Sequence, residues 1–205
     1  MLGEAYTFSE EKGGETIHNV SPVKGQETSK SNEGSMQDFH LHTEVAHHSQ
    51  RPHFVVLICI RQDHQRAAVT YVTDISTIFP SLDKEDVVRL RQPEYVIYAP
   101  ASFGPGIPPA RTAILSGSDS PLELRVNFNA MMAASETAKG AMDRLHNRLG
   151  RDRVACTLSP GDLLVLNNRR AVHGRNSFVP RYDGYDRWLQ RVYVRTIPHP
   201  DVGND

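Results

Sequence analysis

Cysteine is scarce in this chain, which has only Cys59 and Cys156 among its 205 residues. Small secreted domains that lack a sufficient core are held together by several disulfides, and two thiols do not make such a framework. Cys59 lies in an apolar run and Cys156 in a strand-like segment, so we expect both to be buried and reduced. The scarcity of cysteine therefore excludes the disulfide-rich class of protein.

Long apolar runs and an excess of charge are missing as well. No run approaches the length of a membrane span, and the N-terminus has no apolar core of the signal-peptide type. The formal net charge is −1, which argues against binding to nucleic acid or to an anionic membrane. We therefore expect a cytoplasmic protein without nucleic-acid or membrane partners.

The composition that is present is that of a globular protein, with 39% hydrophobic and 23% charged residues. The length suits one domain with a real core, and we find no internal repeat. We predict a single domain over residues 1–205, made of a loop-rich segment 1–38, a core 39–197 and a tail 198–205. The first segment is so polar and turn-rich that loop or disorder is expected there.

Short strand-like segments dominate the rest of the chain. Residues 54–60 are apolar and β-branched, which is typical of a buried strand. Further strands are predicted at 67–72, 94–99, 112–116, 122–128, 154–158, 162–166 and 191–196. Many short strands with few helices indicate a mainly antiparallel barrel or sandwich with helices packed outside it.

Two helices are predicted between these strands. Residues 81–92 have Ser81 as the expected cap, with acidic residues early and arginines late, as the helix dipole prefers. The second helix is predicted over residues 135–149, with Ser135 as the cap at its start and Gly150 as the cap at its end. The apolar stripe of this second helix consists of Ala138, Met142, Leu145 and Leu149.

The segment His42-Thr43-Glu44 has the composition of a metal site. In an extended strand, side chains two apart point the same way, so His42 and Glu44 can face one point. His173, late in the chain, can supply a third ligand. Two histidines and one carboxylate with other positions open are the arrangement of non-haem Fe(II) oxygenases.

Chance alone supplies about one His-x-acid triplet in a chain with 10 His and 24 Asp+Glu among 205 residues. His199-Pro200-Asp201 is a second such triplet, in a proline-rich tail where no strand can hold it. The first triplet differs because His173, Arg187 and Arg191 follow it later in the chain. Arginine grips a carboxylate bidentately, which suits the far carboxylate of a bound 2-oxo acid. Residues 187, 189 and 191 share a face of the predicted strand; a pair of surface arginines is the alternative interpretation.

Several segments along the chain form a recognisable set. They are Gly13-Gly14, residues 19–23, 39–44, 158–162 and 167–169, His173-Gly174-Arg175, and residues 180–191. This set resembles the clavaminate synthase-like branch of Fe(II)/2-oxoglutarate oxygenases, which contains hydroxylases of free arginine and asparagine. The resemblance implies a mainly β fold with flanking helices, a double-stranded β-helix or jelly roll, which agrees with the predicted strands.

The resemblance also implies roles for single residues. His42, Glu44 and His173 match the iron ligands. Arg187 matches the arginine that pairs with the distal carboxylate of 2-oxoglutarate, and Thr70 matches a threonine that hydrogen-bonds the same cosubstrate. Arg191 matches a second arginine, which we expect on the carboxylate of the substrate or cosubstrate. The other histidines nearby, His40, His47, His48 and His53, match no ligand position.

The implied reaction uses Fe(II), 2-oxoglutarate and O₂. Oxidative decarboxylation of 2-oxoglutarate to succinate and CO₂ is coupled to hydroxylation of an unactivated C–H bond, here expected at Cβ of a free or carrier-bound amino acid in specialised metabolism. Desaturation or ring closure at the same iron is a related outcome. The metal carries the difficult chemistry, so no catalytic acid or base is expected beyond its ligands.

Two features depart from the family pattern. Family members carry a sizeable N-terminal portion before the segment that resembles residues 1–23, so we expect an N-terminally truncated jelly roll with exposed sheet edges and apolar patches. Asn127 and Asn129 share a face where arginine-hydroxylating relatives carry aspartates, and the loss of charge predicts a substrate with a neutral polar side chain. Asn32 falls at a loop position that contacts substrate in relatives, with plain disorder as the alternative.

Two other functions are left open by the sequence. A truncated, catalytically inactive jelly roll could act as a binding protein, and the metal content per chain would distinguish it. A structural zinc site is disfavoured, because such sites usually close with four ligands, often cysteine. Neither cysteine lies near the triad in sequence.

Overall fold

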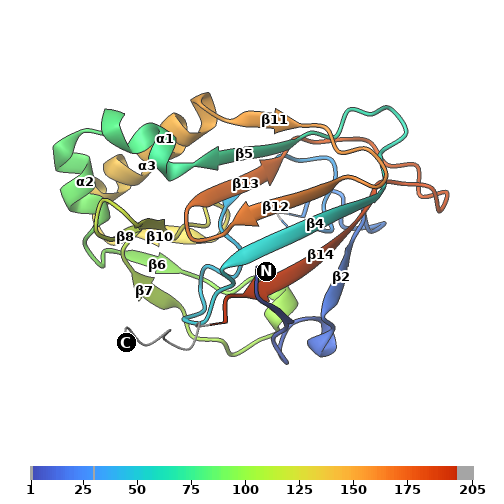
Figure 1. The fold of residues 1–205 in the computed structure, drawn as a ribbon, viewed down its shortest axis with the longest axis horizontal. Helices are drawn as coiled ribbons and strands as arrows, with labels where there is room; N and C mark the ends of the chain where they lie inside the picture. Colours follow the sequence, from blue (N-terminus) through green and yellow to red (C-terminus); the bar gives the residue numbers. More distant parts are fainter. Residues whose placement is uncertain (1, 30, 198–205) are drawn as a thin grey trace, which may run out of the picture.

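Two antiparallel sheets form the body of the molecule (Figure 1). The computed structural model describes residues 2–29 and 31–197. The larger sheet has the order β1 (Glu4–Tyr6), β14 (Trp188–Arg195), β4 (Phe54–Arg61) and β12 (Leu163–Asn167), and β2 (Ile17–Val20) also pairs with β14. The smaller sheet has the order β11 (Val154–Cys156), β5 (Thr70–Asp74), β13 (Ala171–Arg175) and β3 (Phe39–His42). The arrangement confirms the predicted jelly roll with flanking helices.

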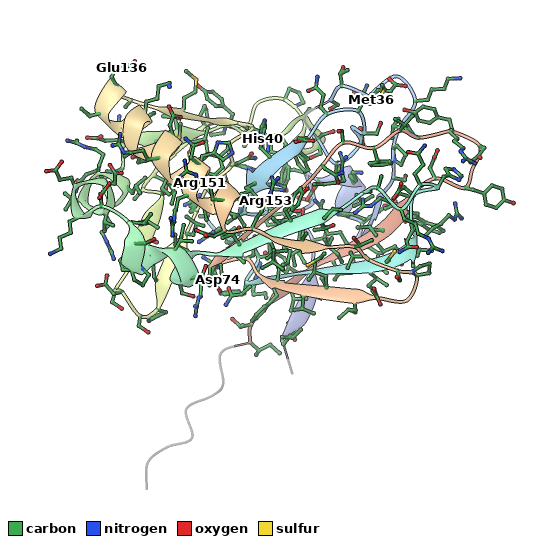
Figure 2. The ribbon with its side chains drawn as sticks, turned by 90° about the horizontal axis from the view of Figure 1, so that it is seen from above. Met36, His40, Asp74, Glu136, Arg151 and Arg153 are labelled. Atoms are coloured by element: carbon green, nitrogen blue, oxygen red, sulfur yellow. The ribbon has the colours of Figure 1, made fainter. Side chains whose placement is uncertain are left out.

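The three α-helices and the smaller β-pairings gather at one end of the two sheets (Figure 1). A third sheet has the order β10 (Met131–Ala133), β6 (Tyr95–Ile97) and β7 (Ala110–Thr112), and β8 (Leu115–Gly117) pairs with β9 (Leu122–Leu124). The helices are α1 (Ile75–Ile78), α2 (Lys84–Leu90) and α3 (Glu136–Arg151), with 3-10 turns at Lys12–Gly14, Phe79–Ser81 and Ala101–Phe103. Seen from above, α3 lies beside the start of β3 (Figure 2), where the His146 and His40 ring centroids are 5.6 Å apart. Within the described ranges, no helix has the length and apolar character needed to cross a membrane.

Helix α3 confirms the second helix prediction. The hydroxyl of Ser135 accepts a hydrogen bond from the Ala138 N–H at 3.2 Å, which caps the first turn. The apolar stripe is buried at Ala138, Leu145 and Leu149, where it packs into the core shared with α1, α2 and β6. The predicted end at Gly150 is wrong, because the helix continues to Arg151.

The larger sheet covers a second core with alternate side chains of β4. Val55, Leu57 and Cys59 are buried and point to the same face, where they pack with Leu189 and Tyr193 of β14. Both cysteines are free thiols, as predicted. Cys156 is only partly buried, because it lies on β11 at the edge of the smaller sheet, so the prediction of two fully buried thiols is wrong.

The N-terminal segment contains two strands that were not predicted. Residues 1–38 were expected to be loop or disorder, but β1 and β2 both pair with β14 at the edge of the larger sheet. Most side chains of these short strands are exposed. An edge strand of this kind has no apolar alternation, so sequence pattern alone misses it.

Several predicted boundaries were wrong for local reasons. The strand predicted at 67–72 begins only at Thr70, because the Asp63 carboxylate accepts hydrogen bonds from three backbone N–H groups and holds a turn before it. These donors are Gln65, Ala67 and Ala68. Such carboxylate-stabilised turns compete with an extended strand.

The first helix and two further strands are also shorter than predicted. Ser81 does not cap a helix; its hydroxyl donates to the Ile78 carbonyl at 2.7 Å within a 3-10 turn, and α2 begins at Lys84. The segment 112–116 is divided between β7 and β8. The segment 122–128 leaves the strand after Leu124 and turns toward β3, where Asn127 forms an isolated bridge with His42.

The outer face of the larger sheet exposes aliphatic side chains. Val165, Val56, Val192 and Ile17 lie side by side on four paired strands. Ile17 is 50% exposed, Leu163 58% and Val165 37%. The expectation of exposed apolar surface therefore agrees with the structure. The division of the chain into segments within one domain stays a prediction, and the tail 198–205 with its His199-x-Asp201 triplet lies outside the described residues.

Candidate metal centre

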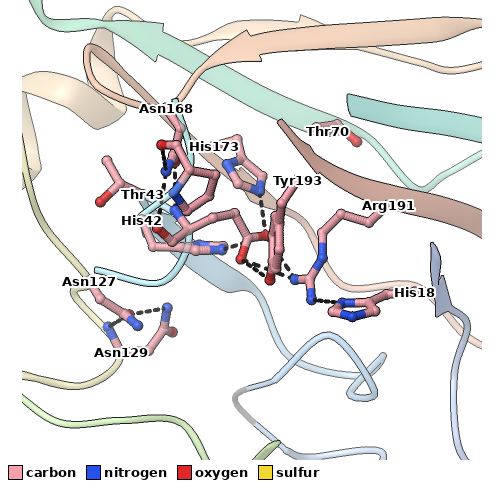
Figure 3. Close-up of polar contacts among 12 residues, drawn as sticks. His18, His42, Thr43, Thr70, Asn127, Asn129, Asn168, His173, Arg191 and Tyr193 are labelled. Carbon is pink, nitrogen blue, oxygen red and sulfur yellow. Dashed lines mark hydrogen bonds and ion pairs between the residues drawn. The ribbon is translucent and has the colours of Figure 1, made fainter. Parts of the chain in front are cut away.

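Strands β3 and β13 bring the two predicted histidine ligands together. The strands pair antiparallel with His42 directly opposite His173, and the ring centroids are 4.5 Å apart. Glu44 follows two residues after β3, and its Oε1 lies 3.9 Å from His42 Nε2 and 3.4 Å from His173 Nε2 (Figure 3). All three side chains are buried, and their candidate ligand atoms lie within 4.8 Å of one another. The three residues predicted as ligands thus form one cluster.

The donor geometry fits a single metal ion. Ligand atoms about 2.1 Å from an ion and at right angles are about 3 Å apart, so small side-chain movements would bring all three atoms to one ion. The Nδ1 atom of His42 lies 2.9 Å from the His40 carbonyl, which only accepts hydrogen bonds. Nδ1 therefore carries the proton and the Nε2 lone pair faces Glu44, as a metal ligand requires.

Gly174 allows the close approach of the two ligand strands. A Cβ atom at this position would lie 2.5 Å from the Phe39 carbonyl oxygen of β3. The register between β13 and β3 is irregular at this point, between His173 and Arg175. Only glycine fits there without moving the strands apart, which gives the His-Gly pair of the motif a structural cause.

Burial and neighbouring charges hold His42 and Glu44 in protonation states that suit metal binding. Burial, together with the nearby His173, lowers the pKa of His42 to about 4, so its ring is neutral at pH 7. Burial opposes ionisation of Glu44, but the Arg191 guanidinium more than compensates and lowers the pKa of that carboxyl below its usual range. Neutral imidazole and ionised carboxylate are the forms that bind metals.

Arg191 contacts the second side of Glu44. Its Nη1 donates to both carboxylate oxygens, at 2.9 and 3.0 Å, and its Nη2 donates to Glu11 Oε1 at 2.8 Å and to His18 Nδ1 at 2.8 Å (Figure 3). The Tyr193 hydroxyl lies 3.3 Å from Glu11 and 3.4 Å from Glu44. The structure therefore places Arg191 on the carboxylate of a candidate ligand, where we had expected it on a substrate or cosubstrate carboxylate.

Arg187 and Thr70 line a small cavity beside the cluster. His173 and Glu44 also border this cavity. The Arg187 Nη2 atom lies 3.4 Å from the Thr70 hydroxyl, and burial lowers the pKa of the guanidinium to about 10. No carboxylate of the described residues lies within 4.0 Å of this guanidinium. A buried cation without an anionic partner is costly, so the cavity favours an anion.

A second cavity opens on the other side of the cluster. It is bordered by His42, Glu44 and the three asparagines of the predicted substrate site, Asn32, Asn127 and Asn129. Asn129 donates to the Asn127 side-chain oxygen at 3.2 Å and to the His40 carbonyl at 3.3 Å, which fixes the pair (Figure 3). Its own Oδ1 is buried without a hydrogen-bond partner in the described part of the chain. Asn32 borders both cavities.

Glu11, His18 and His47 belong to this region. Glu11 and His18 were missed from the sequence, and His47 was named there only as a histidine that matches no ligand position. Glu11 and His47 border the second cavity, and each has a buried side-chain atom without a partner among the described residues, Glu11 Oε2 and His47 Nε2. Burial raises the pKa of Glu11 and lowers that of His47 to about 4. Glu11 lies in a polar segment interpreted as loop, so no local pattern signalled that its carboxylate is buried.

A second group with ligand-type side chains has a structural explanation. His64 Nε2 lies 3.4 Å from one oxygen each of Asp183 and Asp186. Both carboxylates already accept backbone N–H groups, from Tyr185 in the first case and from Arg181 and Tyr182 in the second. These bonds shape the loop that precedes β14.

Comparisons with known proteins agree with this geometry. The family described as "Taurine catabolism dioxygenase TauD, TfdA family" matches residues 2–193. The L-asparagine oxygenase of Streptomyces coelicolor is 38% identical over 95% of this chain and 59% of its own length. Clavaminate synthase 2 of Streptomyces clavuligerus is 33% identical over 95% of this chain and 61% of its own.

Solved structures show the same similarity in three dimensions. Asparagine oxygenase in complex with Fe(II), 2S,3S-3-hydroxyasparagine and succinate superposes with a TM-score of 0.91 at 38% identity, over 95% of this chain and 61% of the other. The non-heme iron oxygenase OrfP with Fe and alpha-ketoglutaric acid gives 0.84 at 30% identity, over 96% and 62%. The chain thus spans about three fifths of the length of these relatives.

Proposed function

Since the chain belongs to the TauD/TfdA family of dioxygenases, we propose that it is an Fe(II)- and 2-oxoglutarate-dependent oxygenase that hydroxylates a small amino-acid substrate. The observation that carries this proposal is the buried cluster of His42, Glu44 and His173 beside Arg187, which forms no ion pair within residues 2–29 and 31–197. The cytoplasmic location, the role in specialised metabolism and the oxidation at Cβ stay predictions from the sequence.

The metal and cosubstrate sites follow from the residues present. His42, Glu44 and His173 would hold the iron, and bound iron with 2-oxoglutarate and O₂ would supply the oxidising chemistry. Arg187 would pair with the distal carboxylate of 2-oxoglutarate, with Thr70 as a hydrogen-bonding neighbour. Because these side chains are buried, water would be kept from the ion pair between Arg187 and the carboxylate, which strengthens that ion pair.

The second cavity suits the two charged groups of an amino acid. Glu11 Oε2 lacks a hydrogen-bond partner in the described chain and can accept from the substrate ammonium. The Nε–H of Arg191 is likewise buried without a partner there and can donate to the substrate carboxylate. Its other contacts hold Glu44 and Glu11 in place, so Arg191 serves the ligand and the substrate at once.

The asparagine pair would contact the substrate side chain. Asn129 Oδ1 is a buried acceptor without a partner among the described residues, which favours a donor group on the substrate. Neither Asn127 nor Asn129 supplies a negative charge to a guanidinium or ammonium. We therefore propose a neutral polar side chain with an N–H group, on a free amino acid; a carrier-bound amino acid is the variant of this proposal.

A screen of free amino acids tests the proposed substrate. With Fe(II), 2-oxoglutarate and O₂, asparagine or glutamine should raise succinate release well above the rate without amino acid, and arginine or lysine should not. The variant Asn129→Asp should move the preference toward cationic side chains, because it restores a negative charge. Stimulation by arginine alone would contradict the substrate assignment, and no stimulation from a chain that binds both cofactors would favour the inactive, binding-only alternative or a carrier-bound substrate.

A further inference from the structure

Asn168 lies outside the ligand cluster but binds the backbone of one of its members. Its Oδ1 accepts the Glu44 N–H at 2.7 Å, and its Nδ2 donates to the carbonyls of Glu44 and Pro52, both at 3.0 Å. The side chain is only 1% exposed. One amide group thus satisfies both backbone polar groups of Glu44 (Figure 3).

Asn168 is itself fixed in place. It lies in the turn between β12 and β13; its N–H donates to the His53 carbonyl at 2.8 Å, and its carbonyl accepts from Arg51 at 3.1 Å. Strand β13 begins three residues later and carries His173. Asn168 therefore links the turn between the two sheets, which leads into the strand of the third ligand, to the backbone of Glu44.

The backbone near Glu44 needs such a link. Strand β3 ends at His42, so Glu44 has no ladder partner of its own. Val45, the next residue, has φ of 51°, a left-handed conformation that is unfavourable for a β-branched side chain. Conformations of this kind persist only where the surroundings determine them strongly.

We propose that Asn168 is a positioning residue, which holds the Glu44 carboxylate in its metal-binding orientation before the metal arrives. The inference rests on the proposed function, because it assigns Glu44 as a ligand. Residues that orient metal ligands typically contribute 10- to 100-fold to metal affinity. Asn168 would do so through the backbone of the ligand, with no contact to the metal.

The variant Asn168→Asp tests the proposal with little change in size. Aspartate keeps the acceptor for the Glu44 N–H but turns an oxygen toward the two carbonyls that now receive N–H groups. We expect Fe(II) and Co(II) affinity, measured by anaerobic titration, to fall about 10- to 100-fold, and the visible spectrum of bound Co(II) to change. Unchanged affinity and spectrum in a folded variant would overturn the proposal.

Asn176→Asp is the matched control. Asn176 also binds a backbone from two sides, accepting from the Val69 N–H at 2.6 Å and donating to the Ala67 carbonyl at 2.8 Å. The backbone that it binds, at residues 67–69, carries no candidate ligand, whereas the backbone that Asn168 binds is that of Glu44. We expect this variant to lose stability but to keep its metal affinity and Co(II) spectrum. If both variants lost metal affinity equally, general destabilisation would explain the loss in Asn168→Asp, and the proposal would be overturned. A wild-type chain that binds no metal would instead refute the proposed function on which it rests.

Hydrogen exchange on the wild-type chain tests the proposal without a mutation. If Asn168 orders Glu44 in advance, the Glu44 amide should exchange slowly in the metal-free chain, and metal should add little protection. Fast exchange at Glu44 that slows only with metal would contradict the proposal. This result applies even if Asn168→Asp does not fold.

Discussion

At the scale of single residues, the two buried arginines of the site differ in their ion-pair partners. Arg191 is buried between the Glu44 and Glu11 carboxylates, whereas Arg187 is equally buried and, among the described residues, bonds to the Thr70 hydroxyl and forms no ion pair. A buried cation with two carboxylates is a structural support, and one without an ion-pair partner favours an anionic ligand. The different surroundings predict different roles for the two arginines, although they are only four residues apart in the chain, Arg187 just before β14 and Arg191 within it.

The role of Arg187 predicts a selective loss in Arg187→Gln. A charge-assisted hydrogen bond is worth about 1.5–3 kcal/mol, so 2-oxoglutarate should bind about 10- to 100-fold more weakly. Metal affinity should be unchanged, because Arg187 contacts none of the three ligands in the described structure. Equilibrium titration of metal-loaded protein with 2-oxoglutarate measures the change. Unaltered cosubstrate affinity would point to another cation, Arg191 first.

His42 predicts a pH dependence of the metal-free chain. Burial lowers its pKa from 6.5 to about 4 in the folded state, so the unfolded state binds more protons between these values. The contribution of His42 to the free energy of unfolding should be fully present above pH 6.5. It should be lost, by about 3 kcal/mol, as the pH drops toward 4. Urea unfolding with chelator present measures this slope.

His42→Gln is the comparison for the pH experiment. In this variant the free energy of unfolding should depend less steeply on pH, because the contribution of His42 is gone. The contribution of His47 should stay, since burial lowers the pKa of His47 to about 4 as well. Identical slopes in the two proteins would show that His42 is not buried in its neutral form.

At the scale of elements, the pairing of β3 with β13 brings the ligands together. Gly174→Ala places a Cβ 2.5 Å from the Phe39 carbonyl, so the strands must separate. We expect a loss of about 1–3 kcal/mol in the free energy of unfolding and a marked loss of metal affinity. Gly150→Ala, where a Cβ meets nothing within 4 Å, should leave both unchanged or raise stability slightly. Calorimetry and metal titration of both variants test this, and normal metal binding by Gly174→Ala would contradict it.

Sequence patterns predicted the elements that depend on apolar periodicity, such as α3 and β4. Resemblance to a family also pointed to the triad His42, Glu44 and His173. The argument that His42 and Glu44 share a strand face does not apply, because β3 ends at His42 and Glu44 lies beyond it. Sequence patterns missed β1 and β2, whose side chains are mostly exposed and whose pairing with β14 is decided far away in the chain. Glu11 was missed for the same reason, since its burial depends on Arg191, 180 residues later.

At the scale of the whole molecule, the larger sheet presents an aliphatic outer face. Leu163 and Val165 on β12 are exposed, beside β4, β14 and β2. Exposed apolar patches of this kind bind hydrophobic dyes and promote association. We expect Leu163→Lys with Val165→Thr to reduce dye fluorescence and light scattering while metal affinity stays unchanged. Dye fluorescence as low in the wild-type chain as in the variant would contradict an open apolar face.

The central claim is that one metal ion and one 2-oxoglutarate bind at His42, Glu44, His173 and Arg187. An anaerobic titration of the purified chain with Fe(II) and then 2-oxoglutarate tests it, with Glu44→Ala and His173→Ala as controls. The account predicts a weak visible charge-transfer band that saturates at one equivalent of each, and no stoichiometric iron in either variant. A folded wild-type chain without the band, or a variant with unchanged iron content, would contradict it.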